Sequence, residues 1–72
     1  MPTPSLESII KGELRRAARH GKGLRKRDLF SPANREGHRI MFELEDKRLI
    51  RSELYSDRAN MEEYIVYYWV GK

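Results

Sequence analysis

Residues 31–70 read SPANREGHRIMFELEDKRLIRSELYSDRANMEEYIVYYWV, and this stretch decides the fold. Its first part carries small and apolar residues at helical spacing, namely Ala33, Gly37, Ile40, Met41 and Leu44. From residue 50 the pattern changes to two runs rich in Tyr, Ile, Val and Trp, separated by the polar residues 57–60. The stretch predicts a helix over residues 32–47, with Ser31 as its cap and Pro32 at its first position. A β-hairpin over residues 50–70 should follow.

Two further helices are predicted before this stretch. The first runs from about residue 4 to 20, with Thr3 as its cap and Pro4 at its first position. Glycine is costly inside a helix, so we expect a neighbouring element to approach closely at Gly12. The second helix is short, at about residues 25–30.

The segment LEDKRLIRSELY, from Leu44 to Tyr55, resembles the joint between recognition helix and wing in winged helix-turn-helix DNA-binding domains. The resemblance implies a single small α+β domain over residues 1–72, with three helices followed by a β-hairpin wing. It also implies a brief strand at Leu24. Proteins of this type include phage or plasmid regulators and DNA-binding modules of replication proteins. Two positions depart from the pattern: Arg25 stands where Ser or Thr usually caps the second helix, and Arg48 stands where glycine usually takes a left-handed turn.

The composition predicts a small domain without catalytic chemistry. The chain has 72 residues and no cysteine, so aliphatic and aromatic packing must stabilise it. No segment has the layout of a signal peptide or the length of a membrane span, which predicts a cytoplasmic protein. The two histidines are far apart with no carboxylate at ligand spacing, and no nucleophile or phosphate-loop motif is present. We therefore expect no enzyme activity, no metal and no cofactor.

Charge is distributed unevenly along the chain. Residues 1–27 carry eight Lys and Arg side chains against two Glu, a net charge of +6, whereas residues 28–72 carry seven basic and nine acidic side chains, a net charge of −2. A concentrated positive charge favours a polyanion such as nucleic acid. The alternative is an ordinary solvated helix face, which most charge runs are.

The leading hypothesis is binding of double-stranded DNA, in transcription regulation or replication. Arg35 and Arg39 would reach guanine from the outer face of the third helix, and Asn34 or His38 would bond a base edge or a phosphate. Phosphate contacts would come from Arg15, Arg16, Lys22, Arg25, Lys26, Arg27 and, at the tip of the wing, Arg58. Phe42 either touches a thymine methyl group or packs beneath the wing, and the second is favoured.

The alternative function is a protein-interaction or homodimerisation module. The last strand is aromatic, and Tyr67 and Trp69 would form the contact surface if they are exposed. The same aromatic residues could instead stack on single-stranded bases, or simply fill the core. Their exposure separates these hypotheses, because a buried Tyr67 and Trp69 would favour the simple DNA binder.

Overall fold

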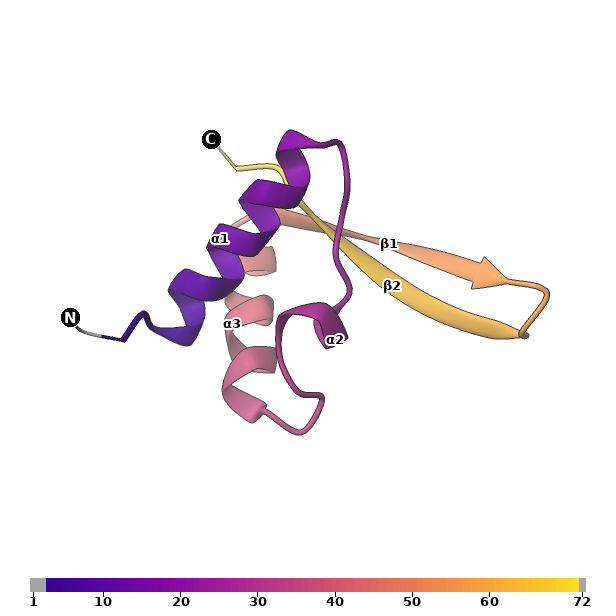
Figure 1. Ribbon diagram of the computed structural model, residues 1–72, viewed down its shortest axis with the longest axis horizontal. Helices are drawn as coiled ribbons and strands as arrows, with labels where there is room; N and C mark the ends of the chain where they lie inside the picture. The colour runs from indigo at the N-terminus through magenta and orange to yellow at the C-terminus, as the bar shows by residue number, and fades with distance from the viewer. Residues whose placement is uncertain (1–2, 72) are drawn as a thin grey trace.

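A computed structural model describes residues 3–71, and it consists of three helices followed by a β-hairpin (Figure 1). The elements are α1 (Leu6–Arg19), α2 (Lys26–Leu29), α3 (Arg35–Asp46), β1 (Ile50–Asp57) and β2 (Glu62–Trp69). The three helices pack together, and the hairpin projects from them along the longest axis of the molecule. The predicted α+β fold class, with its element order, is confirmed.

Both long helices begin later than predicted. The cap of α1 is Ser5, whose hydroxyl accepts a hydrogen bond from the Ser8 N–H at 3.2 Å, so the prediction of Thr3 and Pro4 at these positions was wrong. The cap of α3 is Asn34, whose side-chain oxygen accepts from the Gly37 N–H at 3.2 Å. Ser31 instead starts the turn before α3, so its predicted capping role was also wrong.

The ends of α1 and α3 use the same motif. At the end of α1 the Lys22 N–H donates to Ala17 O, and Gly21 lies in the left-handed region with φ of 68°. At the end of α3 the Leu49 N–H donates to Leu44 O, and Arg48 takes the left-handed position with φ of 59°. The left-handed turn implied at Arg48 is therefore present, at a cost of about 1–2 kcal/mol for a residue with a Cβ.

The helix α2 begins at Lys26 without a Ser or Thr cap. The carboxylate of Asp28 accepts a hydrogen bond from the Arg25 N–H at 3.0 Å, which satisfies one of the free backbone donors at the helix start. One turn is enough to turn Leu29 and Phe30 inward.

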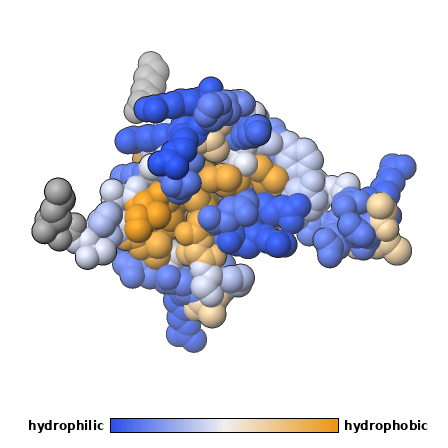
Figure 2. All heavy atoms as spheres, viewed as in Figure 1, coloured by the Kyte–Doolittle hydropathy of each residue, from blue (hydrophilic) through white to orange (hydrophobic). Residues whose placement is uncertain are grey.

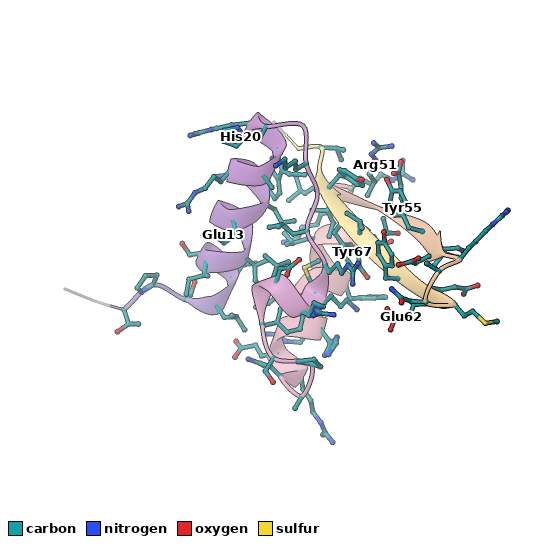
Figure 3. The ribbon with its side chains drawn as sticks, turned by 45° about the vertical axis from the view of Figure 1, so that its right-hand side comes forward. Glu13, His20, Arg51, Tyr55, Glu62 and Tyr67 are labelled. Atoms are coloured by element: carbon teal, nitrogen blue, oxygen red, sulfur yellow. The ribbon has the colours of Figure 1, made fainter. Side chains whose placement is uncertain are left out.

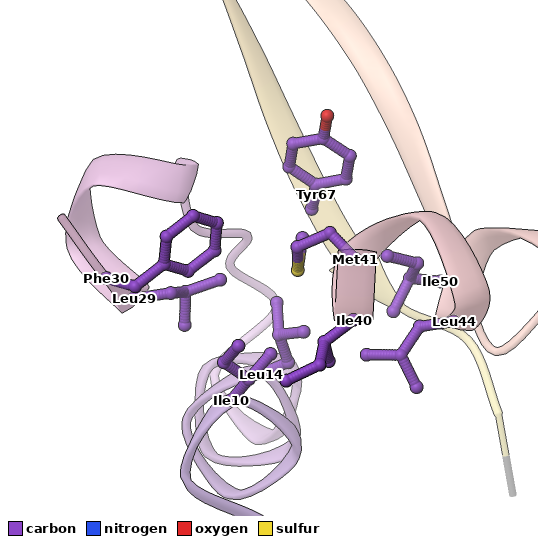
Figure 4. Close-up of a cluster of buried hydrophobic side chains, with 9 residues drawn as sticks. All are labelled: Ile10, Leu14, Leu29, Phe30, Ile40, Met41, Leu44, Ile50 and Tyr67. Carbon is purple, nitrogen blue, oxygen red and sulfur yellow. The ribbon is translucent and has the colours of Figure 1, made fainter. Parts of the chain in front are cut away.

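The core lies where the three helices meet the base of the hairpin (Figure 4). It contains Ile10, Leu14, Leu29, Phe30, Ile40, Met41, Leu44, Ile50 and Tyr67. The predicted stripe of the third helix is buried from Gly37 to Leu44, but Ala33 is exposed because it precedes the helix. Gly37 lies against the ring of Phe30, whereas nothing lies within 4 Å of a Cβ placed on Gly12, so the close approach expected there was wrong.

The hairpin pairs β1 and β2 antiparallel, with Ile50 opposite Trp69 and Leu54 opposite Ile65. Leu24 forms a single antiparallel bridge to Tyr67 through two backbone hydrogen bonds of 2.8 and 2.9 Å, as the resemblance implied. The base of β2 therefore lies between β1 and the connector that leads from α1 to α2. Among residues 3–71, no helix has the length and apolarity needed to cross a membrane.

Candidate nucleic-acid interface

A basic segment runs from α1 through the connector into α2. Between Lys11 and Arg27 it holds eight Lys and Arg side chains and one acidic side chain, Glu13. Figure 2 shows hydrophilic side chains over the C-terminal end of α1 and the start of α2. Within the described residues, Arg16 is the one member of this segment that forms an ion pair, with Glu13 at 3.5 Å. The remaining charge is available to a polyanion.

Aromatic rings of β2 support three of these basic side chains. The Arg15 guanidinium lies 4.7 Å from the ring centre of Trp69, and the Arg25 guanidinium lies 3.7 Å from that of Tyr64. The Lys26 ammonium lies 5.6 Å from the ring of Tyr67. Such cation–π contacts restrict long side chains without neutralising them. These contacts between β2 and the basic segment were not predicted from the sequence, in which the two stretches lie far apart.

An open groove lies between the start of α2 and the outer part of the hairpin. Its volume is about 570 Å³, and it is lined by Arg25, Lys26, Arg27, Leu54, Glu62, Glu63, Tyr64, Ile65 and Tyr67. Three cations stand on the α2 side, and two carboxylates stand near the hairpin tip. The structure thus brings together Arg25, Lys26 and Arg27 beside the hairpin, while Arg58 lies in the turn at its tip.

Two residues predicted to contact DNA from α3 have structural roles at its start. Asn34 caps the helix through its side-chain oxygen. The Nε2 atom of His38 lies 2.8 Å from Pro32 O, and its ring packs edge-on against Phe30 with the centroids 5.1 Å apart. These contacts fix the turn between α2 and α3 and leave both side chains less free to reach a base.

The two arginines of α3 differ in their surroundings. Arg39 bonds Glu43 at 3.0 Å and lies 3.8 Å from Glu36, so two carboxylates outweigh its charge. Arg35 is exposed and forms no ion pair within residues 3–71. The whole of α3 holds two basic and four acidic side chains, a net charge of −2. An acidic helix is repelled by phosphates, which leaves Arg35 as the better placed of the two to reach DNA.

Exposure of the apolar residues differs from two expectations. Phe42 is 72% exposed, so the favoured interpretation, that it packs beneath the wing, was wrong. Tyr67 is 6% exposed and belongs to the core, so the predicted contact surface through Tyr67 and Trp69 was wrong at Tyr67. Trp69 is partly buried beneath Arg15. The exposed apolar pair of the hairpin is instead Leu54 and Ile65, neither of which was predicted to be a contact residue.

On the other face of the hairpin, Tyr55 of β1 (labelled in Figure 3) belongs to a hydrogen-bonded cluster with Glu53 and Tyr68. The Tyr55 hydroxyl donates to Glu53 at 2.7 Å and lies 2.6 Å from the Tyr68 hydroxyl. These bonds to Tyr68 and Glu53 hold the pKa of the Tyr55 phenol well above its usual range. The ring of Tyr55 also stacks on Tyr64, with the centroids 5.7 Å apart. Residues 3–71 contain no group of three His, Cys, Asp or Glu side chains placed to hold a metal ion.

Comparisons of the chain with protein-family models, with curated proteins and with solved structures give no match.

Proposed function

We propose that the protein is a winged helix-turn-helix domain that binds double-stranded DNA, mainly through its phosphates, in transcription regulation or replication. The observation that carries the proposal is the basic segment beside the hairpin, where Arg25, Lys26 and Arg27 line one groove. The order of elements supports it, because a strand residue at Leu24 and a hairpin after the third helix are the layout that the resemblance implies.

The charge of α3 limits what this helix contributes to binding. Arg35 lies in its first turn, whereas Glu43, Glu45 and Asp46 lie toward its end. A helix that enters the groove by its N-terminal half places the cation near DNA and keeps the carboxylates away. Base reading would then rest on Arg35, and most of the affinity would come from phosphate contacts.

The first test is the salt dependence of binding to a random duplex, measured by fluorescence anisotropy. If about five cations neutralise phosphates, log K against log salt should have a slope of about −4 to −5. Arg27→Gln should reduce the magnitude of the slope by about 1. The matched control is Arg51→Gln, because Arg51 is exposed but is bound to Glu53 at 2.9 Å on the hairpin. A wild-type slope near zero, or the same reduction of the slope in Arg27→Gln and Arg51→Gln, would contradict the proposal.

A second measurement separates reading from positioning. On a selected duplex, Arg35→Ala should cost about 1–3 kcal/mol, with a much smaller loss on random DNA. Arg27→Ala removes a phosphate contact from the groove and should weaken both complexes to a similar extent. Both variants must be compared at one salt concentration, because counterion release changes every affinity. If Arg35→Ala lowers the affinity for the two duplexes equally, Arg35 contacts a phosphate and α3 does not recognise the base sequence.

A further inference from the structure

The outer edge of β1 exposes unpaired backbone groups. The Val70 N–H donates to Leu49 O at 2.8 Å, so residue 49 pairs with residue 70 by hydrogen bonding. Hydrogen-bonded and non-hydrogen-bonded pairs alternate along an antiparallel ladder. Ser52, Leu54 and Ser56 are therefore in non-hydrogen-bonded pairs, with their N–H and C=O groups directed away from β2. The same alternation directs the Tyr67 N–H away from β1, and this N–H does donate to Leu24 O, which supports the assignment.

No backbone group of residues 3–71 bonds this edge from outside the hairpin. The opposite edge of the sheet differs, since β2 is bridged by Leu24 and flanked by the start of α2. The strand β1 is eight residues long and contains neither Pro nor Gly. Proteins usually cover or interrupt an edge strand of this length, because it is a template for pairing with another chain.

We propose that two copies of this chain associate by pairing their β1 strands antiparallel about a two-fold axis at Leu54. The product is a four-stranded sheet in which the two β1 strands are central. Leu54 is 65% exposed and its cross-strand neighbour Ile65 is 45% exposed, on the same face of the hairpin. Pairing places Leu54 against Leu54 of the partner subunit, so the two apolar pairs become one stripe across the sheet.

The side chains of β1 favour this register over its neighbours. A two-fold axis at Leu54 sets Arg51 opposite Asp57 of the partner subunit, which is an attractive pair. An axis at Glu53 sets two Glu53 carboxylates opposite each other, and an axis at Tyr55 sets Glu53 opposite Asp57 of the partner subunit, which are repulsive pairs. Axes farther from the centre of the strand pair fewer residues. The charges of this edge therefore favour a second copy of the chain as the binding partner, because each β1 strand supplies both the basic and the acidic residue of the cross-strand pairs.

The first experiment measures the oligomeric state by sedimentation equilibrium over a range of protein concentrations. The contact is small, so we expect a monomer–dimer equilibrium with a Kd on the order of 100 μM. Leu54→Pro removes an outward N–H and leaves every hydrogen bond within the hairpin intact, so it should weaken association at least about tenfold. Val70→Thr alters an apolar side chain of similar exposure away from this edge and should leave the Kd unchanged. A wild-type chain that stays monomeric at about 1 mM would overturn the proposal.

The second experiment tests the register with single cysteines, since the chain has none of its own. Under mild oxidation Leu54→Cys should form a disulfide-linked dimer, because directly opposite Cα atoms are about 5.5 Å apart. Ser56→Cys alone should not, because its two copies are about 14 Å apart along the strands. A mixture of Ser52→Cys and Ser56→Cys chains should cross-link as a heterodimer. Faster cross-linking of Ser56→Cys alone than of Leu54→Cys would exclude this register even if the chain dimerises.

Discussion

At the scale of single residues, Gly37 and Gly12 show that surroundings outweigh residue type. Both lie inside helices, where glycine is intrinsically unfavourable. A Cβ on Gly37 would come within 2.4 to 2.7 Å of the Phe30 ring. That ring is buried and packs edge-on against His38, so it has little room to move. A Cβ on Gly12 meets nothing within 4 Å.

We therefore expect opposite effects of the same substitution at these two positions. Gly37→Ala should lower the free energy of unfolding by about 1–3 kcal/mol, because overpacking against Phe30 outweighs the gain in helix propensity. Gly12→Ala should raise it by about 0.5–1 kcal/mol. Chemical denaturation of the two variants measures both effects. A stabilising Gly37→Ala would show that Phe30 can give way and that α2 packs more loosely than the structure indicates.

The residue scale also shows how much of the candidate site could be predicted. The basic segment was visible as a run of charge, and Arg39 could have been paired from spacing alone, because Glu36 and Glu43 are three and four residues away on one helix face. The burial of Tyr67 could not be predicted in this way. The strand β2 is apolar on both faces, so alternation did not indicate which face meets the helices.

At the scale of elements, the presence of the helices could be predicted from the sequence, but the residues at which they begin could not. The apolar spacing of α1 and α3 identified both helices. Ser31 and Asn34 are both good caps in front of the same apolar stripe, and the sequence does not rank them. The deciding contact is tertiary. His38 contacts Pro32 O and packs on Phe30, which positions the turn before α3 and leaves Asn34 as the cap of that helix.

The position of this cap can be tested by substitution. Asn34→Ala removes the hydrogen bond to the Gly37 N–H and should cost about 1 kcal/mol of stability. Ser31→Ala is the control, since the Ser31 hydroxyl makes one 3.4 Å contact in an exposed turn and its loss should cost at most about 0.5 kcal/mol. Thermal or urea denaturation gives both values. If Ser31→Ala destabilises the protein as much as Asn34→Ala or more, Ser31 rather than Asn34 is the cap of α3.

The hairpin element has its own dependence on pH. The hydrogen bonds of Tyr55 raise the pKa of its phenol above the unfolded value of about 10, so they stabilise the fold fully below that pH and are lost progressively as pH rises above it. The urea midpoint should therefore fall more between about pH 8 and about pH 11 in the wild type than in Tyr55→Phe. Tyr64→Phe keeps the stack on Tyr55 and should fall like the wild type. An identical fall in all three chains would exclude a role for the Tyr55 hydrogen bonds.

At the scale of the whole molecule, nine buried hydrophobic side chains form the core of residues 3–71, and the hairpin adds little to that core beyond its base. A domain this small buries a modest fraction of its surface, so each core side chain carries a large share of the stability. The outer hairpin and the basic segment are surface features displayed by that core. The same substitution should therefore have different effects in the core and on the surface. The buried Leu44 and the exposed Leu54 allow a direct comparison.

Leu44 is 1% exposed at the centre of the core, whereas Leu54 stands on the outer hairpin. Leu44→Ala should cost about 2–5 kcal/mol, because it combines lost burial with a cavity between α1, α3 and the hairpin base. Leu54→Ala removes the same atoms from an exposed site and should cost no more than about 0.5 kcal/mol. Urea denaturation at a low protein concentration, where the chain is monomeric, compares the two. In a domain with little stability to spare, Leu44→Ala should leave a detectable unfolded fraction without denaturant. Equal midpoints for the two variants would mean that α3 is rotated about its axis relative to this structure, with a different face toward α1.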